Sequence, residues 1–312
     1  MKLSYIITTR NKLPRLRAVL SGLLAQRAND EEILVVDGGS TDGTVDYLRS
    51  LYDRGLIQKY VSERDFGEAH GFNKGILEAK GELVRCVTDD DAFYWPEVRK
   101  CREFLLANPA IDMVGTDGAL TNWSSADPFM PSRHAEHFRA HLAGKMAHFW
   151  WPGLGLMFRR SAMALTGLFD TRFTIVDLEF SLRVSTSKAR LAWYTGSTFV
   201  WIPTKASNSV AMARAQALDR CRLSRYYGVI HNGCSWWDSA LDGVKAMLRG
   251  PKHALLRIQP KPFPPPEWVF PANEDWEAGH RRCIAWLEES NRRFPGEFVL
   301  PPAIGGSSSG VG

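Results

Sequence analysis

The chain has 312 residues, of which 45% are hydrophobic and 23% are charged, so it can bury a large core and wholesale disorder is not expected. Its net charge of +5 suits an anionic ligand or surface, but it is too weak to predict nucleic-acid binding. The five cysteines are scattered and form no CxxC pair, so neither a disulfide framework nor a zinc site is expected. No apolar run is long enough to cross a bilayer, and we expect a cytoplasmic protein.

The first 110 residues alternate between short apolar runs, typical of buried strands, and apolar residues at helical spacing. Repeated strand–helix alternation favours parallel pairing through crossover helices, so we predict an α/β fold with a mostly parallel, doubly wound central sheet flanked by helices. Strands are predicted at 3–9, 33–37, 56–62 and 83–88, with helices between them and a further helix that opens at Trp95.

Beyond residue 110 the pattern is mixed, and strands and helices no longer alternate regularly. Further strands are predicted at 113–116, 154–158 and 190–194, and helices at 207–227 and 276–292.

Polar side chains follow three of the predicted strands. Thr9 and Asn11 follow the first strand, Asp37 ends the second, and the run 89–91 follows the fourth. Ligands gather at the carboxyl ends of the strands in such sheets, so we predict a ligand site at this edge.

Three consecutive carboxylates, Asp89, Asp90 and Asp91, repel one another directly after an apolar strand. A divalent cation would resolve this conflict, because Mg²⁺ and Mn²⁺ prefer oxygen ligands and can bridge the oxygens of a diphosphate. A polar turn with solvated acids fits this segment equally well.

The segment VVDGGSTDGT, at 35–44, has glycines that permit a tight turn. Ser40, Thr41 and Asp42 are candidate caps for the next helix. We interpret Asp42 as part of an ordinary turn, and Asp37 as a residue that accepts hydrogen bonds from a nucleotide base or ribose.

Together these segments resemble a known family. The motifs ITTRN, VVDGGSTDGT, GEAHGFNKG, the acidic triplet and GLFDTRFTIVDLEFSLR occur in the order seen in family 2 glycosyltransferases of the GT-A fold. The resemblance covers about the first two thirds of the chain. It implies an inverting enzyme that uses Mn²⁺ or Mg²⁺ to move a hexose or N-acetylhexosamine from a nucleotide-diphosphate sugar to the hydroxyl of a sugar or lipid-linked acceptor.

The resemblance also implies roles for individual residues, and it suggests polysaccharide or glycolipid assembly as the setting. Asp177 matches the catalytic base, and Asp90 matches the metal ligand, with Asp91 as a second candidate ligand. The implied nucleotide-binding residues are Thr9, Asn11, Asp37, Asn73 and Asp89, and the implied acceptor region includes Trp151 and Glu179.

Three positions depart from the family pattern. Thr88 stands where many members have the first acid of a DxD motif, Phe72 where many have arginine, and Val176 where an acid is usual. The altered DxD leaves open a non-catalytic nucleotide-sugar-binding protein on the same fold. An NAD-dependent dehydrogenase is not favoured, because no GxGxxG loop follows the first strand.

The resemblance implies a nucleotide-sugar-binding half at 1–110 and an acceptor and catalytic-base half of the same domain at 111–230. Composition indicates a basic, proline-rich C-terminal extension with a terminal helix at 231–304 and a flexible tail at 305–312. Basic and aromatic residues mix in Trp236–Lys261. This segment suggests either peripheral contact with the inner face of a membrane or a helix that covers the core with its basic side in water.

Overall fold

The computed structural model describes residues 1–228 and 264–302. Within these residues we find no helix with the length and apolar character that membrane crossing requires. The segment Trp236–Lys261 and the predicted tail at 305–312 lie outside the described residues, so the hypothesis of membrane contact stays a prediction.

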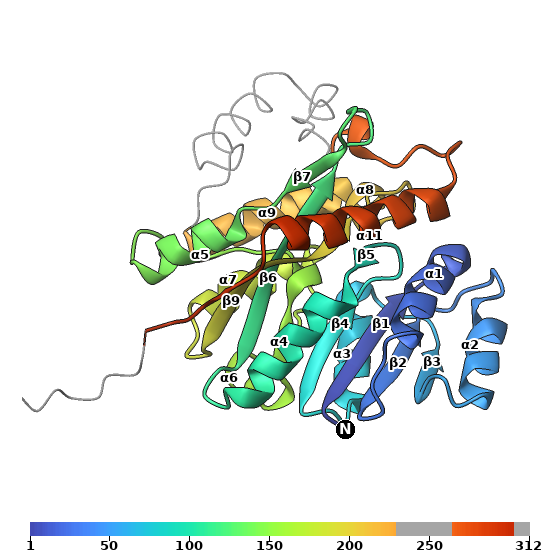
Figure 1. Ribbon diagram of the computed structural model, residues 1–312, viewed down its shortest axis with the longest axis horizontal. Helices are drawn as coiled ribbons and strands as arrows, with labels where there is room; N and C mark the ends of the chain where they lie inside the picture. The colour runs from blue at the N-terminus through green and yellow to red at the C-terminus, as the bar shows by residue number, and fades with distance from the viewer. Residues whose placement is uncertain (229–263, 303–312) are drawn as a thin grey trace, which may run out of the picture.

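The first four strands pair in parallel, as the alternation of the sequence predicted (Figure 1). β1 (Leu3–Thr9) lies between β2 (Glu31–Asp37) and β4 (Leu83–Val87), and β3 (Lys59–Ser62) pairs with the outer side of β2. Because all four strands run in the same direction, the residues that follow them gather at one edge of the sheet.

The rest of the sheet contains both parallel and antiparallel pairs. Across the whole sheet the strand order is β10-β9-β6-β8-β4-β1-β2-β3. β8 runs antiparallel to both of its neighbours, β4 and β6, whereas the long pair β6 and β9 is parallel. The strands that follow β4 in the chain are β5 (Ala92–Phe93), β6 (Met113–Thr121), β7 (Phe129–Pro131), β8 (Met157–Arg159), β9 (Leu191–Trp201) and β10 (Phe298–Val299).

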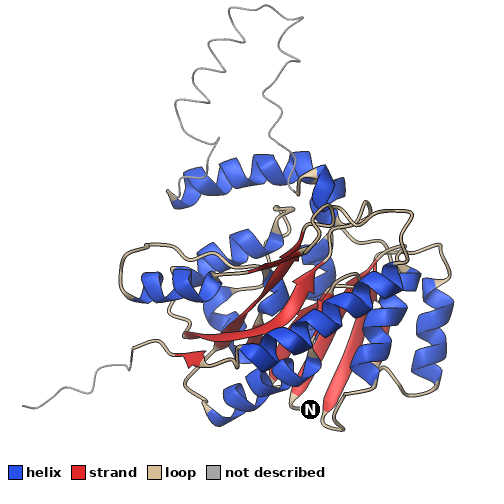
Figure 2. Ribbon diagram, turned by 45° about the horizontal axis from the view of Figure 1, so that its top comes forward, coloured by secondary structure: helices blue, strands red, loops and turns tan. Residues whose placement is uncertain are grey.

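Helices cover both faces of the sheet (Figure 2). The predicted helix at 207–227 is interrupted at Met212, so it forms a short α8 and a longer α9. The helices are α1 (Leu13–Leu24), α2 (Thr44–Asp53), α3 (Glu68–Glu78), α4 (Trp95–Ala107), α5 (His134–Leu142), α6 (Met163–Thr166), α7 (Val176–Ser185), α8 (Asn208–Ala211), α9 (Ala213–Tyr227) and α11 (Trp276–Arg293), with 3₁₀ turns at Gly153–Gly155, Arg160–Ala162 and Pro266–Trp268.

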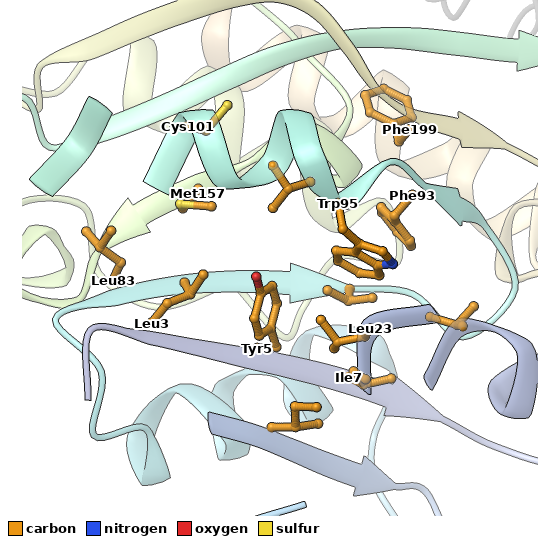
Figure 3. Close-up of a cluster of buried hydrophobic side chains, with 14 of the residues drawn as sticks. Leu3, Tyr5, Ile7, Leu23, Leu83, Phe93, Trp95, Cys101, Met157 and Phe199 are labelled. Atoms are coloured by element: carbon orange, nitrogen blue, oxygen red, sulfur yellow. The ribbon is translucent and has the colours of Figure 1, made fainter. Parts of the chain in front are cut away.

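The alternation of side chains along β1 supplies both layers of the core. Leu3, Tyr5 and Ile7 point to the face covered by α1 and α4, where Tyr5 meets the edge of Trp95 with ring centroids 5.7 Å apart (Figure 3). Ile6 points to the opposite face and packs with α3 and α7. Successive residues of a strand face opposite sides, so β1 contributes buried apolar side chains to both layers.

The C-terminal helix α11 completes the domain by packing on β5 and β9. Its apolar side buries Cys283 and Leu287 against Val200 of β9. Near its end, the Asn291 side chain accepts a hydrogen bond from the backbone N–H of Ser197 and donates one to its carbonyl. The helix is therefore part of the same core as the sheet.

Three of the cysteines, Cys86, Cys101 and Cys283, are buried free thiols.

Helix α3 lies so close to β1 that only glycine fits at one contact. A Cβ atom at Gly75 would lie 2.2 Å from Cγ2 of Ile6, which is far inside van der Waals contact. The variant Gly75→Val should therefore lower the free energy of unfolding in urea by about 2 kcal/mol, because overpacking a core costs roughly 1–3 kcal/mol.

Leu77→Val is the matched control, because Leu77 is on the same helix and 73% exposed. This variant should change the free energy of unfolding by only about 0.5 kcal/mol. Equal urea midpoints for the two variants would contradict the close packing of α3 on β1.

Candidate active site

The three acids after β4 are buried, with Asp89, Asp90 and Asp91 exposing 3%, 4% and 3% of their surfaces. A solvated polar turn is therefore excluded as the explanation of this segment. Buried carboxylates need a compensating charge or hydrogen bonds, since an isolated buried charge is strongly unfavourable.

Lys12 supplies the compensating charge for two of these acids. Its Nζ lies 3.0 Å from Oδ1 of Asp89 and 2.8 Å from Oδ2 of Asp90. Burial lowers the pKa of Lys12, but the two carboxylates outweigh it and raise the pKa above its usual value. Burial raises the pKa of Asp89 to about 6 against the opposing charge of Lys12. Lys12 follows β1 in the chain, so this contact joins the ends of β1 and β4.

Asp91 has other hydrogen-bond partners than Lys12. Its Oδ2 accepts a hydrogen bond of 2.6 Å from the Thr88 hydroxyl, and its Oδ1 accepts one of 2.7 Å from the backbone N–H of Ile202. Burial, together with the negative charge of Asp90, raises the pKa of Asp91. One carboxylate oxygen thus bonds within the turn and the other joins the turn to the segment after β9, which does not support the metal-ligand role predicted for Asp91.

Asp37, at the end of β2, is fully buried and accepts hydrogen bonds from the hydroxyls of Ser40 and Ser62. Nearby, Thr9 Oγ1 and Asp89 Oδ2 are buried and have no well-formed hydrogen bond. Thr9 and Asp37 thus end β1 and β2, and Asp89 follows the adjacent parallel strand β4, as predicted. The Thr9 side chain and the Asp89 carboxylate are close enough to interact, and this contact opposes the effect of burial on the pKa of Asp89.

Asn11 and Asp42 organise the loops at this edge. Asn11 has a positive φ of 53°, and its side-chain carbonyl accepts a hydrogen bond of 2.8 Å from the N–H of Thr41. Asp42 accepts hydrogen bonds from the backbone N–H groups of Leu13 and Thr44. Asp42 therefore belongs to an ordinary turn, as interpreted. Ser40 and Thr41 do not cap α2, whose N-cap residue is Gly43.

Asn73 connects α3 to the chain segment before α7. Its side-chain amide donates a hydrogen bond of 2.8 Å to the carbonyl of Phe169 and accepts one of 3.0 Å from the N–H of the same residue. These two bonds hold the segment that leads to Asp177. The predicted contact between Asn73 and the nucleotide remains a prediction.

Asp177 lies in the first turn of α7. Its Oδ2 accepts a hydrogen bond of 3.3 Å from the backbone N–H of Gly153, and its Oδ1 accepts one from the N–H of Leu178. Burial raises its pKa above the usual value, although these two N–H groups and the charge of Arg220 on α9 act in the opposite direction. A carboxylate with a raised pKa is a better proton acceptor than an ordinary aspartate.

Glu68, the first residue of α3, shows that the distant acids lie in one region. The charges of Lys12, Asp90 and Asp177 all act on its carboxylate, and burial raises its pKa to about 7. Its Oε2 accepts a hydrogen bond of 3.0 Å from Nδ2 of Asn208 on α8. The structure thus brings the predicted metal ligand and the predicted base to the same side of the molecule.

The segment before α8 also reaches the acidic turn. Ser207 donates a hydrogen bond of 2.9 Å from its hydroxyl to Oδ2 of Asp90, the same oxygen that Lys12 contacts. A single carboxylate oxygen therefore joins the β1–α1 loop, the acidic turn and the start of α8.

The two residues predicted for the acceptor region lie inside the protein. Trp151 is 1% exposed, and its ring stacks on Phe149 with centroids 5.0 Å apart. Glu179 is 4% exposed and pairs with Arg183 at 2.7 Å. In this arrangement Trp151 packs the core and presents no ring face to a sugar. Trp150, the adjacent aromatic residue, is 39% exposed.

Sequence reasoning missed several polar residues of this region. Lys12 follows the ITTRN motif directly, and Glu68 lies inside GEAHGFNKG. Their positions at these motifs could have identified both as candidates. Ser207, Asn208 and Arg220 had none, because only the path of the chain after β9 brings them to the acids.

Comparison with known proteins identifies the family. Residues 4–165, which contain β1–β4 and the acidic turn, match the family model described as "Glycosyl transferase family 2". The chain belongs to this family.

Relatives of known or inferred activity are glycosyltransferases. A "PGL/p-HBAD biosynthesis glycosyltransferase" of Mycobacterium tuberculosis is 25% identical over 197 residues, which are 61% of this chain and 72% of that protein. The "Poly-beta-1,6-N-acetyl-D-glucosamine synthase" of Staphylococcus epidermidis is 26% identical over 58% of this chain and 45% of that protein. An "Uncharacterized glycosyltransferase" of Nostoc is 34% identical, but the match spans only 29% of its length.

Solved structures share the fold. S. aureus TarS 1-349 in complex with UDP-GlcNAc superposes with a TM-score of 0.57 at 15% identity, over 94% of this chain and 92% of that chain. The mannosyltransferase PcManGT from Pyrobaculum calidifontis, in complex with GDP-Man and Mn²⁺, gives 0.57 at 16% identity, over 94% and 86%. The family 2 enzyme therefore has the predicted GT-A fold, a mixed α/β structure with a central sheet flanked by helices.

The family implies a divalent metal, and the point between Asp89 and Asp90 is where one would fit. No three His, Cys, Asp or Glu side chains in residues 1–228 and 264–302 converge as a metal site. Mg²⁺ and Mn²⁺ in nucleotide sites do not need such a group, because phosphates and water complete their coordination. The ammonium of Lys12 shows that this point favours a cation, and Asp89 Oδ2 is a buried acceptor without a hydrogen bond. The residues fit the metal if Lys12 moves aside.

Removal of the Lys12 ammonium should lower the free energy of unfolding of the ligand-free protein. Lys12→Met leaves two buried carboxylates without their partner, which costs about 3–5 kcal/mol when a buried ion pair is broken. Mn²⁺ should then raise the melting temperature more in the variant than in the unmodified protein, because it binds only the folded site. Thermal unfolding with and without Mn²⁺ measures both effects.

Lys2→Met is the matched control, because Lys2 pairs with Glu82 at the surface. Exposed pairs contribute only about 0–1 kcal/mol. If Lys12→Met melted like the Lys2→Met variant and showed no added response to Mn²⁺, Lys12 would not be the counter-charge of the acidic turn.

Proposed function

We propose that this glycosyltransferase is an inverting, metal-dependent enzyme that transfers a hexose or N-acetylhexosamine from a nucleotide-diphosphate sugar to a hydroxyl acceptor. One set of contacts supports the proposal. Asn208 bonds to Glu68, and its neighbour Ser207 bonds to Asp90, while the charges of Asp90 and Asp177, 87 positions apart in the sequence, both act on the Glu68 carboxylate. We infer that a donor held at Asp90 presents its sugar toward Asp177.

Different residues are proposed to bind the nucleoside and the metal. Thr9, Asp37 and Asp89, at the ends of three strands, are proposed to bind the nucleoside, with Asn11 and Asn73 holding the loops around it. Asp90 is proposed to hold the metal, which when bound neutralises charge on the departing nucleotide diphosphate.

Asp177 is proposed to act as the general base. Its carboxylate takes the proton of the acceptor hydroxyl while that oxygen attacks the anomeric carbon from the face opposite the diphosphate. Attack from the opposite face inverts the configuration at that carbon. The backbone N–H of Gly153 orients the Asp177 carboxylate through its hydrogen bond to Oδ2.

Polysaccharide or glycolipid assembly is the proposed setting, since the relatives with assigned roles act there by name. A sugar or a lipid-linked sugar is accordingly the proposed acceptor, and a cytoplasmic location, with contact to the inner membrane face, remains part of the proposal.

A panel of nucleotide diphosphates (UDP, GDP and dTDP) with and without Mn²⁺ tests donor binding directly. One of them should raise the melting temperature, and more so with Mn²⁺, because a ligand of the native state stabilises it. Hydrolysis of the matching nucleotide sugar in the presence of Mn²⁺ separates the enzyme from a non-catalytic binding protein. No shift with any nucleotide would contradict the proposed function.

Asp177→Asn should abolish transfer while leaving donor affinity nearly unchanged, because asparagine keeps the shape of the side chain and cannot accept the proton. Loss of general base catalysis lowers kcat by roughly 10²–10⁴-fold. In the unmodified enzyme, kcat should fall as the pH decreases through the pKa of Asp177, which burial raises above its usual value.

Asp170→Asn is the control for Asp177→Asn, since Asp170 belongs to the same segment and pairs with the exposed Arg172. It should keep most of the activity. Undiminished turnover by Asp177→Asn would remove Asp177 from the role of base.

Asp90→Ala should abolish the dependence of donor binding on Mn²⁺. Titration calorimetry of the nucleotide diphosphate, with Mn²⁺ and with EDTA, should give one affinity in the variant and two in the unmodified protein. Asp46→Ala, at an exposed position on α2, is the control and should keep both affinities. Retention of the Mn²⁺ effect in Asp90→Ala would place the metal elsewhere.

A further inference from the structure

The pair Glu68 and Asn208 has no assigned role in the proposed reaction, although it lies among the reacting groups. Glu68 begins α3 and Asn208 begins α8, so two distant elements meet at their hydrogen bond of 3.0 Å. Asn208 is exposed and Glu68 is partly buried, so a ligand can reach both side chains. Neither residue is needed to hold the sheet together, since both lie outside the hydrophobic clusters.

The charges around Glu68 define where this pair lies. Its hydrogen-bond partner Asn208 follows Ser207, which bonds to Asp90, and the charges of Lys12, Asp90 and Asp177 all act on the Glu68 carboxylate. In a displacement reaction the transferred sugar occupies the space between the leaving diphosphate and the attacking hydroxyl. A group that interacts with both Asp90 and Asp177 therefore lies beside that sugar, rather than beside the nucleoside.

We propose that Glu68 and Asn208 form the subsite that hydrogen-bonds the hydroxyl groups of the transferred sugar and so selects the donor. This inference rests on the proposed function. A carboxylate offers two acceptor oxygens, and an amide offers both a donor and an acceptor, so the pair can satisfy adjacent hydroxyls, each of which donates and accepts. A polar pair that binds a sugar hydroxyl rejects a sugar that lacks it or presents it in another orientation, because the site's polar groups then remain unpaired.

The connection to Ser207 adds a second feature to this subsite. Ser207, the residue before Asn208, donates its hydroxyl hydrogen bond to Asp90. The start of α8 thus contacts the proposed metal ligand through one residue and Glu68 through the next. Asn208 is held at a fixed position relative to the diphosphate end of the donor, which is what discrimination between sugar epimers requires.

The test compares the binding of nucleotide sugars with that of the bare nucleotide diphosphates by calorimetry, in the presence of Mn²⁺. The probes are UDP and GDP, and UDP-glucose, UDP-galactose, UDP-N-acetylglucosamine and GDP-mannose. Glu68→Gln and Asn208→Ala should each lower the affinity for the preferred nucleotide sugar about 10-fold, as expected for the loss of a charge-assisted or a neutral hydrogen bond. Both variants should bind the bare diphosphate within about 2-fold of the unmodified protein, because the subsite does not touch the nucleoside.

Glu78→Gln is the matched control, because Glu78 ends the same helix and pairs with Lys59 at the surface. It should bind every probe like the unmodified protein. The preference between the epimers UDP-glucose and UDP-galactose should also shrink in the Glu68→Gln and Asn208→Ala variants but not in Glu78→Gln.

Two results would overturn the inference. If the Glu68 and Asn208 variants lowered the affinities for the diphosphate and for the nucleotide sugar equally, the pair would contribute to nucleotide binding and not to sugar binding. If they left the sugar preference intact, the sugar would bind elsewhere. A failure of the unmodified protein to bind any of the probes is a separate outcome, because it would contradict the proposed function itself.

Discussion

The contact between Lys12 and the carboxylates of Asp89 and Asp90 is the interaction on which the site depends. Two buried acids next to each other repel, and without a cation between them this turn could not pack against the sheet in charged form. Lys12 provides that cation from the neighbouring strand connection, and Ser207 adds a hydrogen bond to the same oxygen of Asp90. The ammonium thus holds the edge of the sheet in the arrangement that a metal and a diphosphate would require.

The four acids of this region differ in role because they differ in surroundings. Asp91 uses both oxygens in hydrogen bonds to the protein, so it is a structural residue of the turn. Asp90 contacts a cation, whereas Asp177 contacts mainly backbone N–H groups. Glu68 has an amide partner on a different helix. Environment, more than residue type, therefore separates the roles proposed for these acids in metal binding, proton transfer and sugar recognition.

Much of the fold could be predicted from the sequence, because strand and helix periodicities are local. Leu3–Thr9 and the helix that opens at Trp95 are found as predicted, and the carboxyl ends of the parallel strands do carry the polar residues. The break of the predicted helix at Met212 was not visible in the pattern, because apolar spacing continues on both sides of it. The antiparallel placement of β8 depends on tertiary pairing that a local pattern does not encode.

The site was predictable only in part. Asp90 and Asp177 could be assigned from motifs, yet the direction of the Asp91 side chain depends on the Ile202 backbone, 111 positions away. Trp151 could equally have been a sugar platform or a core residue by sequence, and its burial against Phe149 decides for the core. Contacts between distant segments, such as Glu68 with Asn208, become visible only when the chain is folded.

A crystal structure with Mn²⁺ and the nucleotide diphosphate that stabilises the protein, with anomalous data at the manganese edge, tests the central claim most directly. The account predicts a manganese peak between Asp89 and Asp90, about 2 Å from a carboxylate oxygen of Asp90, with the ammonium of Lys12 displaced toward the phosphates. A bound nucleotide with Lys12 still between the two acids and manganese at another place would contradict it.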